Sequence, residues 1–332
     1  MGFFRKLMLP LAELSVVGSY GRGGYRLRSP DFDPADLAVD LRGERHVVTG
    51  ATSGLGLAAA HALSALGATV VMVGRDAEKL ARAVEGVPGA VGERCDLSDL
   101  EEVGALAARL GKQPLASLVH NAGFIVPERR LTRQGHESAF ATHVLAPFVL
   151  SHRLMDRLAQ APRTGRLVWV SSGGMYSQKL DLAKAEALHG TYDGVRAYAQ
   201  HKRAQVLLSE SFQRLFEARG LGVASNAMHP GWVDTPGVEV GLPRFYRRMK
   251  RWLRTPEAGA DTIVWLCARP TPPAAGRFYL DRKARRTEIV PGTRHDDGDR
   301  ARLWELCARL TGIDVAAPRG RVRGRGPCGR SP

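Results

Sequence analysis

A short apolar strand that runs into a glycine-rich turn constrains the fold of this chain more than any other feature. Residues 46–56 read HVVTGATSGLG, and an alanine-rich segment predicted as helix continues over 57–66. Glycines let a backbone approach a ligand closely. The N-terminus of the following helix offers free N–H groups and the positive end of the helix dipole. The segment therefore predicts a cradle for the phosphates of a nucleotide.

Strand and helix patterns then alternate along the chain. Apolar runs of strand length recur at residues 69–73, 91–94, 115–119, 166–170, 223–227 and 277–280, and helices are predicted at 76–84, 100–110, 136–158 and 198–219. Regular alternation predicts a single-domain α/β fold, a doubly wound parallel sheet of about seven strands with helices on both faces. Ligands of such sheets bind beyond the carboxyl ends of the strands, where the polar motifs of this chain fall.

Four segments are predicted from these patterns. Residues 1–42 form an N-terminal extension, 43–285 the α/β domain, 286–316 a C-terminal helical segment and 317–332 a disordered basic tail. Residues 20–36 are rich in Gly, Arg, Pro and Asp and are predicted to be a loop. The apolar residues 3–11 fit either a helix packed on the domain, which we favour, or an interfacial membrane anchor.

Composition narrows the class of protein. The net charge of +15 suits a polyanionic cofactor or an anionic membrane surface, and no nucleic-acid-reading motif accompanies it, so nucleic-acid binding is not expected. The four cysteines show no CxxC pairing, which argues against a zinc site and fits a reducing, cytoplasmic environment. No apolar run reaches membrane-spanning length, so at most peripheral membrane contact is expected.

A tyrosine and a lysine are spaced for acid–base chemistry. Tyr198 and Lys202 lie four residues apart on a predicted helix and therefore share one face. A phenol titrates near ~10, and a neighbouring ammonium lowers its pKa. Tyr198 could then act as a general acid or base. The spacing alone also fits an ordinary amphipathic helix, but Ser172, at the end of a predicted strand, supports the catalytic interpretation.

Four motifs together identify a family. They are residues 49–56, Asn121-Ala122-Gly123, the YAQHK segment 198–202, and Pro230-Gly231 with Thr235. Across residues 43–285 the chain resembles the classical short-chain dehydrogenase/reductases. Residues 29–34, 170–175 and 228–237 resemble more narrowly the "member twelve"-like branch. The resemblance implies a Rossmann-type fold and a hydride transfer between nicotinamide and a carbonyl or alcohol of a lipophilic small molecule. Its catalytic residues would be Ser172, Tyr198 and Lys202.

The resemblance also assigns residues to the cofactor. They are Gly50, Ser53, Gly54, Leu55, Gly56, Arg75, Asp96, Leu97, Asn121, Gly123, Tyr198, Lys202, Pro230, Val233 and Thr235. An acidic residue after the second strand would select NAD. Arg75 stands there instead, and a guanidinium suits a 2′-phosphate. NADP(H) is therefore predicted in preference to NAD(H), with no metal.

Two departures leave alternatives open. His143 stands where the family carries an asparagine that holds a proton-relay water. It either holds a water, shuttles a proton itself or packs as a polar helix residue. His120 replaces the first asparagine of the usual Asn-Asn-Ala-Gly. The segment 237–256 occupies the place of the family's substrate lid. Its six cations either face water, while its apolar side closes the site, or bind a membrane surface or an anionic substrate. The alternative function is a nucleotide-binding scaffold or redox sensor at a membrane surface, with weak or no catalysis. A homo-oligomer is expected from the resemblance alone.

Overall fold

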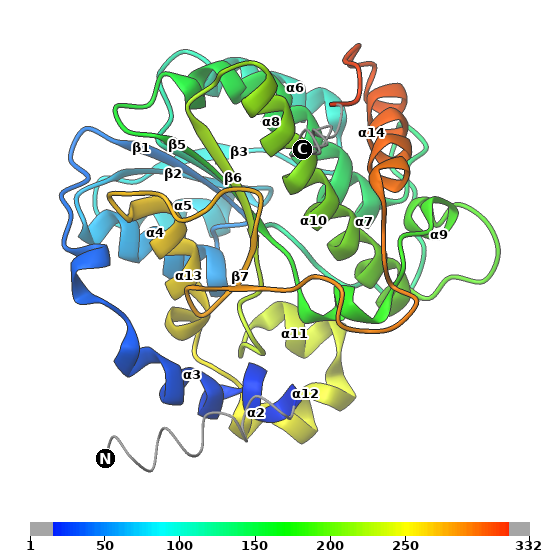
Figure 1. Cartoon of the computed structure of the whole chain (residues 1–332), viewed down its shortest axis with the longest axis horizontal. Helices are drawn as coiled ribbons and strands as arrows, with labels where there is room; N and C mark the ends of the chain where they lie inside the picture. The colour runs from blue at the N-terminus through cyan, green and yellow to red at the C-terminus, as the bar shows by residue number, and fades with distance from the viewer. Residues whose placement is uncertain (1–15, 319–332) are drawn as a thin grey trace, which may run out of the picture.

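An eight-stranded sheet forms the centre of the computed structural model, which describes residues 16–318 (Figure 1). The strands are β1 (Arg45–Thr49), β2 (Thr69–Gly74), β3 (Val91–Arg94), β4 (Ser117–His120), β5 (Gly165–Val170), β6 (Val223–Met228), β7 (Phe278–Leu280) and β8 (Lys283–Arg285). Their order is β3-β2-β1-β4-β5-β6-β7-β8. The first seven are parallel, and β8 pairs antiparallel with β7. The prediction of a doubly wound parallel sheet is confirmed, with one short antiparallel strand more than expected.

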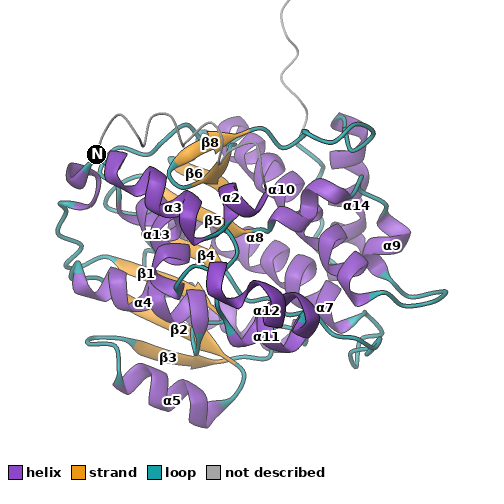
Figure 2. Cartoon of the chain, turned by 90° about the horizontal axis from the view of Figure 1, so that it is seen from below, coloured by secondary structure: helices purple, strands orange, loops and turns teal. Residues whose placement is uncertain are grey.

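Helices cover both faces of the sheet (Figure 2). One face packs against α4 (Gly54–Ala65), α5 (Ala77–Glu85) and α13 (Pro256–Ala268). The other packs against α6 (Leu100–Leu110), α8 (Ala146–Ala159), α10 (Gly194–Ala218) and α14 (Asp297–Thr311). The shorter helices are α2 (Val16–Tyr20), α3 (Arg22–Arg28), α7 (Ser138–Phe140), α9 (Leu182–Glu186), α11 (Pro236–Gly241) and α12 (Pro243–Met249). None of the helices described over 16–318 is both long and apolar enough to cross a bilayer.

The hydrophobic core lies in two layers, one on each side of the sheet. Val47 and Val71 belong to one layer, while the next residues along the strands, Val48 and Met72, belong to the other. This alternation is the period of two of a β-strand. Because both faces are covered, central strands carry continuous apolar runs, such as VVMV in β2 and LVWV in β5. Each fully buried side chain of this size stabilises the fold by roughly 1.5–3 kcal/mol.

The predicted long helix 136–158 is interrupted. It consists of α7, a π-helical turn over Ala141–Leu145, and α8. Pro147 lies in the first turn of α8 and has no N–H, so the carbonyl of His143 loses the donor that an α-helix would give it. A π-turn at this point places His143 on the side of the helix that faces α10.

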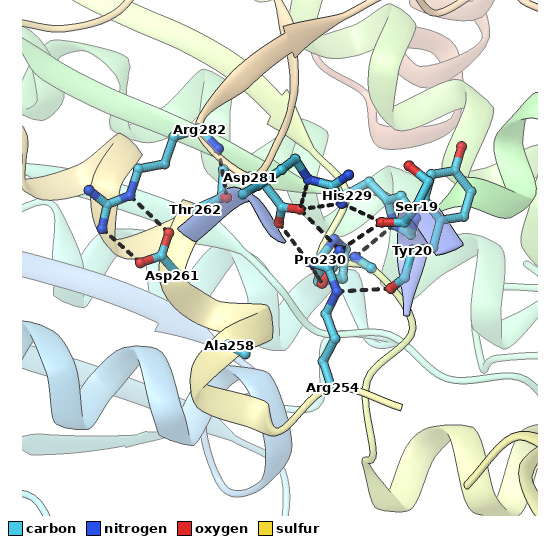
Figure 3. Close-up of polar contacts among 12 residues, drawn as sticks. Ser19, Tyr20, His229, Pro230, Arg254, Ala258, Asp261, Thr262, Asp281 and Arg282 are labelled. Atoms are coloured by element: carbon cyan, nitrogen blue, oxygen red, sulfur yellow. Dashed lines mark hydrogen bonds and ion pairs between the residues drawn. The ribbon is translucent and has the colours of Figure 1, made fainter. Parts of the chain in front are cut away.

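The prediction of a loop over residues 20–36 was wrong. This stretch contains α3 and two 3₁₀ turns at Ser29–Asp31 and Pro34–Leu37. Its helices are stabilised by a remote side chain, because the Arg254 guanidinium donates to the carbonyls of Ser19 and Tyr20 (Figure 3). The predictions for residues 3–11 and for the tail lie outside the described residues, apart from residues 317–318.

Candidate active site

A single cavity collects nearly all of the predicted site residues. It has a volume of about 530 Å³ and lies beyond the carboxyl ends of β1, β2, β4, β5 and β6. Of the residues predicted to bind cofactor or catalyse, all except Gly56 line it. Parallel strands end at the same edge of a sheet, which is why segments distant in sequence meet there.

The glycine-rich turn is shaped by backbone constraints. Gly50 and Gly54 have φ of +65° and +53°, a region that favours glycine. A Cβ on Gly50 would lie 2.8 Å from Cα of Ala122, and one on Gly54 would lie 3.0 Å from Cγ2 of Thr235. Gly56, also predicted to bind the cofactor, does not itself line the cavity. It lies behind the cavity, where a Cβ would meet the Asn121 amide nitrogen at 2.5 Å.

The N-terminus of α4 fits a phosphate. Its N-cap residue, Ser53, makes no side-chain capping bond, whereas aspartate side chains cap α5, α6, α10 and α14. The first N–H groups of α4 therefore keep their hydrogen-bonding capacity for a ligand in the cavity. Together with the glycine cradle, this geometry fits the pyrophosphate of a dinucleotide.

Three charged residues follow β2 and β3, and two of them, Arg75 and Asp96, line the cavity. Arg75 is exposed and forms no ion pair with any residue from 16 to 318. Asp76, predicted as a helix cap, accepts from the N–H of Lys79 at the start of α5. Oδ1 of the Asp96 carboxylate accepts hydrogen bonds from the N–H and the hydroxyl of Ser98, so this oxygen already has partners within the protein. Arg75 is thus the charged side chain left open to a ligand here.

Asn121, Val233 and Thr235 line the cavity and also fix its walls. The Asn121 amide donates to the carbonyls of Thr49 and Gly50, at 2.8 and 3.2 Å, which ties the end of β4 to the glycine turn. Thr235 accepts from the N–H of Val238 and begins α11. Val233, Pro230 and Gly123 complete this side.

Ser172, Tyr198 and Lys202 face the same cavity. Ser172 follows β5, and the other two lie on α10. Burial raises the pKa of Tyr198 to about 12, and a hydrogen bond with Ser172 lowers it in part. Burial lowers the pKa of Lys202 to about 7. Burial outweighs the lowering of the tyrosine pKa that was expected from the lysine. Lys202 Nζ lies 5.3 Å from the Tyr198 ring centroid.

The two ring nitrogens of His143 are both engaged. Nε2 accepts from the N–H of Phe124 at 3.0 Å, and Nδ1 lies 3.1 Å from Nδ1 of His201. His201 Nε2 lies 2.8 Å from the carbonyl of Ala185, to which it must donate. His201 Nδ1 is then an acceptor, and His143 Nδ1 the donor. Burial lowers the pKa of His143 well below its usual value and that of His201 to about 4. His143 is therefore a neutral packed residue with no nitrogen free for a relay water.

His120 lies outside the cavity. Its Nε2 is 2.7 Å from the Ser151 hydroxyl, and its ring packs against Trp169 with centroids 4.6 Å apart. Burial lowers its pKa to about 3, so it is neutral. The histidine that replaces the usual asparagine is a core residue.

The mouth of the cavity is apolar. It is lined by Val238 of α11, by Leu242 between α11 and α12, by Phe245 of α12, and by Ile125 and Val195. The Phe245 ring packs against Trp232 with centroids 5.1 Å apart. The basic residues of the lid lie on the outside, and the exposed ones are Arg244, Arg247, Arg248, Lys250 and Arg251. Arg254 was wrongly grouped with them, because it is buried against Asp281.

Comparison with known proteins gives matches over most of the chain. Residues 45–240 match the family model described as short chain dehydrogenase. The chain is 36% identical over 301 residues to dehydrogenase/reductase SDR family member 12 of Bos taurus, across 88% of this chain and 93% of that protein. It is 34% identical over 303 residues to polyprenol dehydrogenase of Mus musculus, across 86% and 89%. A solved structure of an uncharacterized protein from Mycobacterium Paratuberculosis matches with a TM-score of 0.69 at 28% identity, across 87% of this chain and 99% of that one.

Proposed function

This chain belongs to the short chain dehydrogenase family, and on that premise we propose that it is an NADP(H)-dependent oxidoreductase acting on a carbonyl or alcohol of a lipophilic molecule. The observation that carries the proposal is the meeting of Ser172, Tyr198 and Lys202 in one cavity with the glycine cradle. When bound, nicotinamide supplies or accepts the hydride. The chain itself supplies the proton and the binding groups.

Each of the three residues has a separate task in the proposal. The Tyr198 phenol is neutral at physiological pH, since its pKa is about 12, and a neutral phenol is the form that donates a proton to a carbonyl oxygen. Ser172 hydrogen-bonds that same oxygen and the phenol. Lys202 has three N–H donors, two of which bind protein acceptors, and the third is left for the ribose hydroxyls.

Arg75 supports the preference for NADP(H). It lines the cavity, is exposed, and lies one residue past the end of β2. A guanidinium binds phosphate oxygens in a bidentate manner, while the neighbouring Asp76 carboxylate is used as a helix cap. Titration with NADPH and NADH, in the wild type and in Arg75→Glu, tests this role.

A lipophilic substrate is supported by the apolar mouth and by similarity to a polyprenol dehydrogenase. Such a substrate resides in membranes, and the outer side of the lid carries five exposed cations beside Trp252, which is 39% exposed. Each cation near an anionic bilayer contributes roughly 1 kcal/mol of binding. We therefore include peripheral membrane contact through α12 in the proposal.

Two experiments separate this proposal from a scaffold without catalysis. NADPH oxidation and NADP⁺ reduction are followed with a panel of aldehydes, ketones and alcohols that includes long isoprenoids. Turnover that disappears in Tyr198→Phe supports the proposal, whereas NADPH binding with no turnover across the panel favours the scaffold. Co-sedimentation with phosphatidylserine-containing vesicles tests membrane contact, with the charge reversal Arg247→Glu/Arg248→Glu compared with Lys79→Glu/Arg82→Glu on exposed α5.

A further inference from the structure

The buried ammonium of Lys202 has two protein acceptors. Its Nζ donates to the carbonyl of Val170 at 2.8 Å and to Oε1 of Gln205 at 3.1 Å. Both Lys202 and Gln205 are buried, with exposed fractions of 2% and 0%. A buried charge is costly unless hydrogen bonds replace the water it has lost. Gln205 is the side-chain acceptor that meets this need among residues 16–318.

The other end of the Gln205 amide is also occupied. Its Nε2 donates to the carbonyl of His143 at 2.9 Å. That carbonyl is available because the residue four positions later is Pro147, which has no N–H. The amide orientation is determined by chemistry, because an ammonium only donates and a carbonyl only accepts. Gln205 therefore bridges Lys202 and the π-helical turn in one defined direction.

We propose that Gln205 is a positioning residue for Lys202, whose carboxamide fixes the ammonium between β5 and the π-helical turn and stabilises its charged form. The proposal rests on the role of Lys202 in the proposed function.

The surroundings of Lys202 leave few other groups to set its charge. Tyr198 and His201 share α10 with it, and His143 faces it from the π-helical turn. All three are neutral near pH 7. The end of β5 presents the carbonyl of Val170 and the hydroxyls of Ser171 and Ser172. Burial is the cause of the lowered pKa of Lys202. The Gln205 oxygen is the side-chain atom that accepts from the ammonium, so its removal is expected to change that pKa.

The direct test measures the charge of Lys202 in the protein without cofactor. Lysine carbons are labelled with ¹³C, the Lys202 signal is identified by its loss in Lys202→Arg, and its pKa is read from an NMR titration. Gln205→Leu removes the acceptor and is expected to lower the Lys202 pKa by about one unit, whereas Gln205→Glu adds a negative charge and raises it by a similar amount. The matched control is Gln200→Leu, because the Gln200 amide on the same helix binds residues 178–181 instead.

Shifts in opposite directions for the two Gln205 variants, with no shift in the control, support the proposal. An unchanged Lys202 pKa in Gln205→Glu overturns the proposal. This variant is the closer of the two in size to the wild type, so the test can rely on it alone if Gln205→Leu does not fold. Because the titration needs neither substrate nor cofactor, it separates the two ideas. Loss of turnover on every substrate would reject the proposed function while leaving this result to stand.

Discussion

The buried carboxylate of Asp281 offers the sharpest test of how the N-terminal segment is attached. Its side chain is 2% exposed and accepts from two guanidinium groups. Arg254 Nη1 lies 2.6 Å from Oδ1 (Figure 3). Arg28 Nε lies 2.6 Å from Oδ2. The same Arg254 also donates to the carbonyls of Tyr20 and Pro230. One carboxylate therefore connects α3, the loop after β6 and the turn after β7.

The change that isolates this charge is Asp281→Asn. Asp281 has a φ of +51°, a conformation in which asparagine and aspartate are both enriched, so the amide removes the charge without added backbone strain. It removes the buried carboxylate that pairs with both Arg254 and Arg28. Breaking a buried pair in this way costs about 3–5 kcal/mol. For a domain of this size that corresponds to a fall in Tm of roughly 6–10 °C.

Thermal and urea unfolding measure the loss, and limited trypsin digestion locates it. Arg22 and Arg26 are exposed on and near α3 and are expected to be cleaved faster once α3 is released. The matched control is Glu78→Gln, because Glu78 is 88% exposed beside Arg82 and its pair contributes under ~1 kcal/mol. A Tm for Asp281→Asn within the range of the control, with unchanged cleavage, would refute the reasoning.

Four further predictions concern the site. Tyr198→Phe is expected to lower kcat at least about a hundredfold while NADPH affinity, measured by fluorescence titration, stays within a few-fold, because general acid catalysis contributes roughly 10²–10⁴. Arg75→Glu is expected to weaken NADPH binding more than NADH binding, and equal losses would contradict its role. Burial lowers the Lys202 pKa to about 7, and an anionic ligand favours the charged form. NADPH binding should therefore take up protons between about pH 7 and 9 in calorimetry in buffers of different ionisation enthalpy, and this uptake should be absent in Lys202→Met. Arg247→Glu/Arg248→Glu is expected to reduce vesicle binding at low salt with unchanged Tm; retention of binding would remove membrane contact from the proposal.

Local patterns predicted the centre of this molecule well. The strand–glycine–helix unit and the spacing of Tyr198 and Lys202 depend on neighbours within a few residues. They could therefore be recognised from the sequence alone. Spacing does not say which glycine lines the cavity and which, like Gly56, lies against Asn121, a residue sixty-five positions later. The loop predicted at residues 20–36 failed for a similar reason. Its glycine-rich sequence has little helical preference, and its helices are stabilised by Arg254.

The sequence by itself determined the parallel α/β sheet, the phosphate cradle and the pair of Tyr198 with Lys202, because periodicity and short spacings are local properties of the chain. Tertiary structure alone decided the charge states. Burial raises the pKa of Tyr198 and lowers that of Lys202, which reverses the expectation from their spacing. It also decided that His143 is a neutral packed residue and that Gln205 contacts the lysine. Desolvation and hydrogen-bond partners depend on which distant segments pack together, and no short stretch of sequence specifies them.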